Sequence, residues 1–375
     1  MPTGIRTLHI NTERTFRGGE RQVLLLMRGL VERGHPAELV AQPAGELAQR
    51  AEAAGLTVHR IRVRCEADPI AFACLCSRLR DADPDIVHLH DAHAHTLGVA
   101  AAVLTGRGRR VVSRRVVSPV GVNLFSRLKY RRGVDRYVAI SEAVKAKLLE
   151  AGVAPDRVAV VHSCVEPARF ETAADRSDAL RKEFGIPDGA PVVGTVGAMC
   201  PAKGFAHFLR AIPQVLEQAP AARFVLVGDG ELRGDLEREA AGLGLAPGAL
   251  TFAGWRRDVP ELLRFFDLFV SSSVEEGLGT SVLQALASRT PVVVTDAGGL
   301  PEVVEHGESG LVVRRGDPGA LAGGIVALLN DAGRRATMAA AGYRRVADRF
   351  TPAKMVEATV AVYRDVLGGG PEGAR

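Results

Sequence analysis

The sequence has few aromatic residues, few cysteines and no long apolar run. Aromatic side chains make up 5% of its 375 residues and no nucleic-acid motif is present, which disfavours a nucleic-acid-binding protein. The five cysteines form no CxxC pair, and no signal peptide is evident, so we expect free thiols in a reducing cytoplasm. No run of eighteen apolar residues is present to span a membrane. These features predict a cytoplasmic globular protein.

Several common catalytic and nucleotide-binding signatures are also missing. No GxGxxG follows a predicted strand and no GxxxxGK[ST] is present, which argues against a dehydrogenase and a P-loop nucleotidase. The absence of GxSxG argues against a hydrolase with a serine nucleophile. Two DxD-like triplets at residues 81–85 contain or border a proline and precede a strand, so we interpret them as turns.

Short apolar strands alternate with helical segments along most of the chain. Strands are predicted at residues 7–10, 37–42, 57–63, 85–90, 110–113, 136–140 and 158–162, with helices at 20–33, 45–54, 70–80 and after Ser141. The pattern is lost over residues 163–190, and strands resume at 192–197, 224–228, 250–254, 268–270, 291–295 and 311–313. This alternation predicts an α/β fold with two doubly wound, Rossmann-like parallel sheets.

The predicted domains are 1–166, 167–350, and a terminal segment, 351–375, that comprises a helix and a tail. Open parallel sheets bind ligands outside the carboxyl ends of their strands. We therefore expect the two domains to face each other across a ligand-binding cleft.

The segment from Phe269 to Gly310 carries the strongest functional signal. It consists of a strand, a glycine-containing loop at residues 275–279, a helix that begins near Thr280 and Ser281, and a second strand. A helix N-terminus beside a glycine loop presents free backbone N–H groups that suit a phosphate. Glu276 adds a carboxylate that can accept hydrogen bonds from hydroxyl groups. This combination favours a sugar phosphate or a nucleotide sugar.

This segment resembles the retaining glycosyltransferases of family 4, which have the GT-B fold. The family frame is E-G-F-G-x-x-x-x-E-A, and this chain matches it with Glu276-Gly277-Leu278-Gly279 and Ala285, whereas Gln284 replaces the second glutamate. Residues 291–293, 298–304 and 307–312 are also similar to the family. The resemblance extends over nearly the whole chain, and it implies a nucleotide-sugar co-substrate, most simply a UDP- or GDP-sugar, and no cofactor or metal. It also implies that domain 1–166 binds the acceptor, that domain 167–350 binds the nucleotide sugar, and that the terminal helix crosses back to the first domain.

The resemblance implies a role for each residue of the donor site. Lys203, Gly18, Gly19, Gly279, Thr280 and Ser281 would bind the donor diphosphate, and Lys203 would stabilise the charge that develops on it. Donor-sugar hydroxyls would be held by Glu276, Gly277 and Leu278, with Glu276 and Lys203 as the catalytic pair, and Gln284 would contact the ribose. The base loop would be Gly254, Trp255 and Arg256.

The chain departs from the family pattern at three positions. Ala198 stands where the family has a phosphate-binding arginine, Gln284 replaces a glutamate, and Arg115 occupies the place of a histidine that contacts the donor sugar. An arginine there suggests an anionic group on the donor or the acceptor.

Four histidines, at positions 88, 90, 93 and 95, admit two functional interpretations and a structural one. His88 and His90 share one face of a strand, which leaves a zinc site open. The resemblance favours an acceptor site instead, to which we assign His90, Asp91 and Arg115, and strand-end packing is the third alternative.

Residues 106–136 contain ten basic residues and one acidic residue, mixed with apolar side chains. Such a segment can bind an anionic membrane surface or an anionic acceptor, or can form a solvated basic face. A protein of this kind would be cytoplasmic and peripheral to the membrane.

The sequence therefore predicts a retaining, metal-independent glycosyltransferase that acts on a glycan, glycolipid or lipid-linked acceptor in cell-envelope or exopolysaccharide synthesis. Two alternatives stay open. One is a nucleotide-sugar epimerase or phosphorylase of the same fold, and the other is a sugar-nucleotide-binding protein with weak catalysis, which the three departures would explain.

Overall fold

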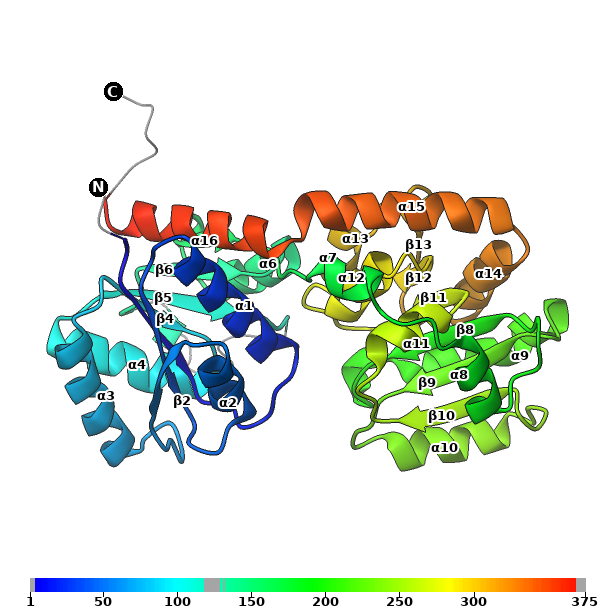
Figure 1. Cartoon of the computed structure of the whole chain (residues 1–375), viewed down its shortest axis with the longest axis horizontal. Coiled ribbons are helices and arrows are strands. Elements are labelled where there is room, and N and C mark those ends of the chain that lie inside the picture. Colours follow the sequence, from blue (N-terminus) through cyan, green and yellow to red (C-terminus); the bar gives the residue numbers. More distant parts are fainter. Residues whose placement is uncertain (1–3, 118–128, 131, 369–375) are drawn as a thin grey trace, which may run out of the picture. The chain divides into compact units, whose positions relative to one another are not determined.

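The computed structural model describes residues 4–117, 129–130 and 132–368 (Figure 1). The chain forms two compact units. Unit 1 comprises Met1–Cys164 and Pro352–Arg375, and unit 2 comprises Val165–Thr351. None of the helices formed by the described residues is both long and apolar enough to cross a bilayer.

Unit 1 is a parallel sheet with the strand order β3-β2-β1-β4-β5-β6-β7. Its strands are β1 (Thr7–Asn11), β2 (Ala37–Ala41), β3 (Thr57–Arg60), β4 (Ile86–Leu89), β5 (Arg109–Arg114), β6 (Arg136–Ala139) and β7 (Val158–Val160). Its helices are α1 (Gly18–Glu32), α2 (Glu46–Ala53), α3 (Pro69–Ala82), α4 (Ala92–Thr105), α6 (Glu142–Glu150), the 3₁₀ turn η1 (Pro155–Arg157) and α16 (Pro352–Val366).

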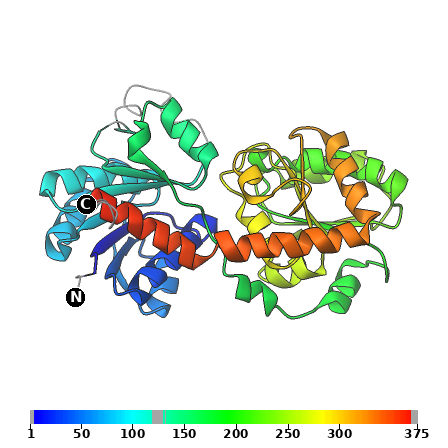
Figure 2. The same ribbon diagram turned by 90° about the horizontal axis from the view of Figure 1, so that it is seen from above.

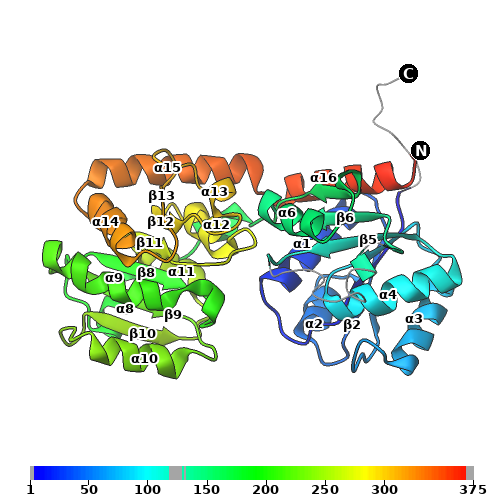
Figure 3. The same ribbon diagram turned by 180° about the vertical axis from the view of Figure 1, so that it is seen from behind.

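The last helix, α16, completes the core of unit 1. It packs against α1 (Figure 2), and its buried residues include Val356 and Tyr363. The approach is close at Gly29, because a Cβ atom there would lie 2.6 Å from Val356 Cγ2. On another side of unit 1, α3 packs against α4 (Figure 3).

Unit 2 is a second parallel sheet, with the strand order β10-β9-β8-β11-β12-β13. Its strands are β8 (Val192–Val196), β9 (Arg223–Val227), β10 (Leu250–Gly254), β11 (Leu268–Ser271), β12 (Val292–Thr295) and β13 (Leu311–Val313). Its helices are α7 (Pro167–Glu171), α8 (Ser177–Phe184), the turn η2 (Pro201–Lys203), α9 (Phe205–Gln218), α10 (Arg233–Gly242), α11 (Val259–Phe265), α12 (Thr280–Ala287), α13 (Leu300–Val303), α14 (Pro318–Leu329) and α15 (Ala332–Arg349).

The two doubly wound parallel sheets that the sequence predicts are confirmed. Both strand orders reverse direction once, between β1 and β4 in unit 1 and between β8 and β11 in unit 2. Ligands of open α/β sheets bind at such reversals, outside the carboxyl ends of the strands. Functional residues are therefore expected at these two places.

Some predicted boundaries were wrong. The glycine pair Gly18 and Gly19 does not belong to a loop but forms the first two residues of α1. Helix α4 was not predicted, because its alanine-rich sequence lacks the polar alternation that marks an amphipathic helix. The structure shows its signals, an Asp91 side chain that accepts from Ala94 N–H and a left-handed Gly106 at the C-cap.

Candidate active site

Lys203 and Glu276 meet at the strand reversal of unit 2. Lys203 ends the turn η2 after β8, and Glu276 lies in the loop after β11. Lys203 Nζ lies 2.5 Å from Glu276 Oε2, and Ser273 Oγ donates to the same oxygen at 3.1 Å. The ammonium group has three donors, so two of them can still bind phosphate oxygens. The sequence assigned both residues to one site, and in unit 2 they are in contact.

Backbone hydrogen bonds join the two loops that carry this pair. The amides of Val274 and Glu275 both donate to Ala202 C=O, at 2.9 and 3.1 Å. Ser272 Oγ donates to Lys203 C=O at 3.0 Å. The Glu275 side chain is exposed. These bonds thus hold the two loops, and with them the backbones of Lys203 and Glu276, next to each other.

The loop after β12 supports the backbone of Glu276. Gly298 has φ +53°, and a Cβ atom there would lie 1.8 Å from Glu276 C=O. Gly299 N–H donates to that carbonyl at 3.1 Å. Only glycine permits this approach, so the loop at residues 297–299 fixes the position of Glu276.

Helix α12 begins directly after this loop. Its N-cap is Gly279, with φ +96°, and no side chain caps the N–H groups of Thr280 and Ser281. Those groups and the helix dipole favour an anion. Gln284 lies one turn further along and is partly buried. Leu278 is 1% exposed, so its side chain belongs to the core and only its backbone can contact a sugar.

The loops after β8, β9 and β10 also lie side by side in unit 2. Gly228 has φ +136°, and a Cβ atom there would lie 1.8 Å from Gly197 C=O. Gly228 N–H donates to Gly254 C=O at 2.8 Å. The glycines therefore let the three strand ends approach each other around one edge of the sheet.

The predicted base loop combines an exposed residue with a structural one. The Trp255 side chain is 66% exposed, and Arg257 stacks over its ring. The Arg256 guanidinium bonds to Asp258 at 2.7 Å and also to Glu183. These hydrogen bonds, above all those that Arg256 donates to Asp258, raise the pKa of the guanidinium. We interpret Arg256 as a brace between the base loop and α8.

In unit 1, a hydrogen bond between the backbone before α1 and a side chain of its first turn fixes the start of the helix. The Glu20 carboxylate accepts from Arg17 N–H at 2.8 Å and is buried. Gly19 faces the Arg115 side chain, because a Cβ atom there would lie 3.5 Å from Arg115 Cδ. Gly18 and Gly19 thus lie near Arg115, but the conformation of neither requires glycine.

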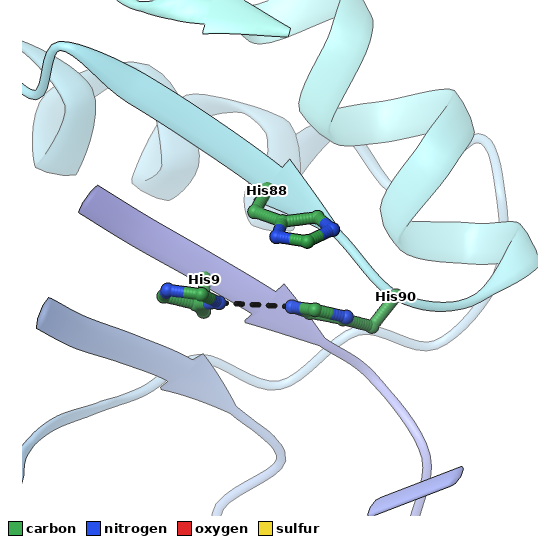
Figure 4. A group of neighbouring side chains, drawn as sticks. All are labelled: His9, His88 and His90. Carbon is green, nitrogen blue, oxygen red and sulfur yellow. Dashed lines mark hydrogen bonds between the residues drawn. The ribbon is translucent and has the colours of Figure 1, made fainter. Parts of the chain in front are cut away.

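Three histidines meet at the strand reversal of unit 1 (Figure 4). His9 lies on β1 and His88 on β4, directly opposite each other in the register, and His90 follows the end of β4. All three are buried. Burial lowers the pKa of His9 to about 3, and it lowers the pKa values of His88 and His90 well below the ordinary range. The rings are therefore neutral.

The ring nitrogens of these histidines already have hydrogen-bond partners. His9 contacts His90 at 2.9 Å and Thr7 Oγ1 at 3.1 Å. His88 contacts Tyr363 Oη at 2.6 Å and Ser113 Oγ at 2.8 Å. The remaining nitrogen, His90 Nδ1, lies 3.4 Å from Arg115 Nη2. A metal ion would have to break these bonds beside a cationic guanidinium, so the arrangement favours a polar network over a zinc site.

The structure brings two of the three predicted acceptor residues, His90 and Arg115, into contact and gives the third, Asp91, a structural role. Arg115 is partly exposed and contacts His90, and burial lowers the pKa of its guanidinium to about 10, so it remains charged at neutral pH. Asp91 accepts from the Thr12 hydroxyl at 2.6 Å and caps α4, which makes it a structural residue. His93 is exposed, and His95 is buried against Tyr130.

Many basic residues of the 106–136 segment are ion-paired within unit 1. Arg109 and Arg110 pair with Asp135 of the same segment, whereas the other partners come from elsewhere in the unit: Arg107 pairs with Asp83, Lys129 with Glu66, and Arg136 with Asp365. Residues 118–128 and 131, which include Arg127 and Arg131, lie outside the described residues. The described part of the segment is therefore a mixed-charge surface.

Comparison with known proteins gives the family. Residues 16–169 match the family model described as Glycosyltransferase Family 4, and residues 190–331 match the model described as Glycosyl transferases group 1. The chain belongs to the group 1, family 4 glycosyltransferases.

Two curated relatives illustrate the range of this family. The 2-deoxystreptamine glucosyltransferase of Streptomyces kanamyceticus is 30% identical over 257 residues, which are 68% of this chain and 66% of that protein. The lipopolysaccharide core biosynthesis glycosyltransferase LpsE of Rhizobium meliloti is 30% identical over 246 residues, or 66% and 68% of the two chains. The chain thus spans about two thirds of each relative.

The fold of this glycosyltransferase is GT-B. The crystal structure of Anabaena HepE in complex with UDP and glucose superposes with a TM-score of 0.83, at 21% identity, over 96% of this chain and 100% of that one.

Sequence reasoning missed two parts of this glycosyltransferase's polar sites. Ser273 is one of them: it lies three residues before Glu276, and its hydroxyl contacts the carboxylate. His9 was treated as an ordinary strand residue. Its role depends on β1 and β4 being neighbours, which the sequence does not state, although a histidine on each of the two predicted strands offered a signal.

Proposed function

We propose that this glycosyltransferase transfers a sugar, with retention of anomeric configuration, from a nucleotide-diphosphate sugar, most simply a UDP- or GDP-sugar. The observation that carries the proposal is the contact of Lys203 with Glu276 at the β8–β11 reversal, next to the uncapped start of α12. One edge of the sheet then offers a cation and free N–H groups for a diphosphate and a carboxylate for sugar hydroxyls.

Each part of the donor has a partner in this arrangement. The diphosphate would lie at the N–H groups of Thr280 and Ser281 and against Lys203. The Oε2 atom of Glu276 already accepts two bonds, so we expect Oε1 to accept from a sugar hydroxyl. Gln284 would hydrogen-bond the ribose as a neutral amide.

The proposed transfer needs no protein nucleophile and no metal. The bond between the anomeric carbon and the diphosphate oxygen breaks while the acceptor hydroxyl bonds to the same face of the sugar. The acceptor proton passes to the departing phosphate oxygen. Lys203 and the α12 N–H groups stabilise the negative charge as it develops.

The acceptor we propose is a glycan, a glycolipid or a lipid-linked sugar of the cell envelope. Two relatives support this class by their names, LpsE and a galactosyltransferase of Escherichia coli that acts on GlcNAc-diphosphoundecaprenol. Contact of residues 106–136 with an anionic membrane surface stays part of the proposal, although the ion pairs of the segment weaken it. We place the protein in the cytoplasm at the inner membrane surface.

A donor panel tests the proposal. We expect calorimetry with UDP-, GDP-, ADP- and TDP-sugars, in the presence of a chelator, to find one donor that binds and slowly releases its diphosphate. Lys203→Ala should lower donor turnover by about 10²–10³-fold, the typical effect of losing a group that stabilises developing charge. The matched control is Lys182→Ala, which removes an exposed lysine of α8.

Two results would contradict the proposal. If no donor binds, Ala198 and Gln284 have disabled the site, and a binding protein with weak catalysis is the better description. If Lys203→Ala has the same turnover as Lys182→Ala, the diphosphate does not lie at Lys203. An epimerase would instead release a changed nucleotide sugar and no free diphosphate.

A further inference from the structure

His9 and His90 belong to a chain of hydrogen bonds with fixed ends. Arg115 Nη2 lies 3.4 Å from His90 Nδ1, and His90 Nε2 lies 2.9 Å from His9 Nδ1. His9 Nε2 lies 3.1 Å from Thr7 Oγ1, whose hydroxyl donates to Pro36 C=O at 3.2 Å. A guanidinium can only donate hydrogen bonds and a carbonyl oxygen can only accept them. The two ends therefore determine the direction of every bond between them.

Both ends give the same proton positions. Because Arg115 donates, His90 Nδ1 must accept, and the proton of the neutral ring is on Nε2. His90 Nε2–H then donates to His9 Nδ1, which leaves the His9 proton on Nε2, facing Thr7. From the other end, the Thr7 hydroxyl hydrogen is used by Pro36, so Thr7 Oγ1 must accept from His9 Nε2–H.

We propose that this one-way relay positions the Arg115 guanidinium, and that Arg115 thereby determines specificity for a phosphate or carboxylate group on the donor or the acceptor. His90 and His9 are positioning residues, since neither is required to touch the ligand. The specificity part rests on the proposed function, whereas the direction of the relay depends only on the hydrogen bonds.

The Arg115 guanidinium has no ion-pair partner among the described residues. Its Nε atom is buried and has no hydrogen-bond partner among the described residues. The buried Nε atoms of Arg110 and Arg136 also lack a partner, but those two guanidiniums are ion-paired, whereas the described residues place no carboxylate within ion-pair distance of the Arg115 guanidinium. A buried arginine nitrogen without a partner is costly. An anionic ligand group would satisfy it.

The relay cannot accept another proton without conflict. The neutral His9 and His90 rings carry one proton each. A third proton would make two N–H donors point at each other, either between His9 and His90 or between His90 and Arg115. The groups around the relay add no negative charge next to the rings. These groups are His88 on β4, Ser113 on β5, Arg115 after β5 and Tyr363 on α16. Glu20 on α1 and Cys164 after β7 interact electrostatically with Arg115. Arg115 and the neighbouring histidines lower the pKa of His90 in addition to burial.

The first experiment reads the proton positions directly. The full chain, labelled with ¹⁵N-histidine, would be examined by long-range ¹H–¹⁵N correlation NMR at pH about 7 and about 5.5, on either side of the ordinary histidine pKa of about 6.5. The variants His9→Asn and His90→Asn assign the signals. We expect both rings to be neutral with the proton on Nε2 at both pH values. A proton on Nδ1 of either ring, or a protonated ring at pH about 5.5, would overturn the relay.

The second experiment compares two substitutions at His9. His9→Asn keeps an acceptor at the δ position for His90, whereas His9→Phe keeps the ring volume and removes the acceptor. If His9 acts through the relay, His9→Phe weakens anion binding about tenfold, which equals ~1.4 kcal/mol, and His9→Asn weakens it less. If His9 only fills space, His9→Asn weakens anion binding more than His9→Phe does. His95→Phe, which removes a buried imidazole outside the relay, is the control.

The probes distinguish the two sources of the anion. Calorimetric Kd values are measured for UDP, GDP and inorganic phosphate, the phosphate with and without saturating UDP or GDP. Weaker UDP or GDP binding in Arg115→Gln places the anion on the donor. Weaker phosphate binding that persists in saturating nucleotide places it on the acceptor. If Arg115→Gln binds every probe as the wild type does, the specificity role of Arg115 is wrong, even where the NMR result supports the relay.

Discussion

At the scale of residues, the two strand reversals hold polar groups of different kinds. In unit 2, Lys203 and Glu276 are partly exposed and oppositely charged, so they can exchange their mutual contact for bonds to a ligand. In unit 1, His9, His88 and His90 are buried and neutral. The first group is suited to binding and chemistry, and the second to maintaining a fixed arrangement of neighbouring side chains.

The neutral histidines should make the protein sensitive to acid. The pKa of His9 is about 3 when folded, against an ordinary value of 6.5, because of burial. Between these values the unfolded chain binds more protons, so the free energy of unfolding falls as the pH falls, by about 1.4 kcal/mol per pH unit for each such ring. Above pH about 6.5 this contribution is fully present.

Denaturant unfolding at pH about 7.5, 6.5 and 5.5 measures this slope. We expect the free energy of unfolding of His9→Asn to fall less steeply with falling pH than that of the wild type, by about 1.4 kcal/mol per pH unit, because asparagine does not titrate. An identical slope in His9→Asn and the wild type would show that His9 is already protonated in the folded protein.

At the scale of elements, glycines in loops determine how closely the strand ends approach. Gly204, which directly follows η2, illustrates this: its φ is +58°, and a Cβ atom there would lie 2.3 Å from Ser272 C=O. Gly228 and Gly298 make equally close contacts with Gly197 and Glu276. The site in unit 2 therefore depends on backbone shape as much as on the side chains that carry charge.

Gly298→Ala should displace Glu276. The new Cβ atom would overlap Glu276 C=O, and the left-handed backbone costs an alanine about 1 kcal/mol or more. We expect a lower midpoint of thermal unfolding and weaker calorimetric binding of the donor that the panel identifies. The matched control is Gly323→Ala in α14, where the space is open and alanine favours the helix by up to ~1 kcal/mol. Equal stability and affinity in the two variants would show that the 297–299 loop does not support Glu276.

The sequence predicted the elements more fully than the contacts between them. Short apolar runs identified the strands, because parallel strands are buried on both faces. Helix α4 was missed, since an apolar alanine-rich helix has no polar face to reveal it. Lys203 and Glu276 were found because each lies in a recognisable local pattern. The partnership of His9 with His90 joins residues 81 positions apart, and only the strand order brings them together.

At the scale of the whole molecule, unit 1 is built from two separate parts of the chain. Helix α16 contributes Met355, Val356, Val360 and Tyr363 to a core otherwise formed by residues 5–164. Tyr363 also reaches the histidine cluster through its bond to His88. Unit 2 lies entirely between these two parts in the sequence.

Removing α16 should unfold unit 1 and spare unit 2. Each of the larger side chains it buries contributes about 1.5–3 kcal/mol, and together they approach the 5–15 kcal/mol that typically stabilises a protein. We expect limited proteolysis of a chain ending at Thr351 to degrade residues 5–164 and leave a fragment close to 165–351. The control is a chain ending at Leu367, which keeps α16. Survival of both units in the shorter chain would show that α16 is dispensable.

The divided construction of unit 1 also sets an order of events on the ribosome. Residues 165–351 are translated before the helix that closes the core of the first unit. Residues up to 164 therefore emerge early, but their core stays incomplete. The α1 surface around Gly29 is uncovered until Val356 has left the exit tunnel. During that interval the nascent chain exposes apolar surface that a chaperone can recognise, although it was the first part to be made.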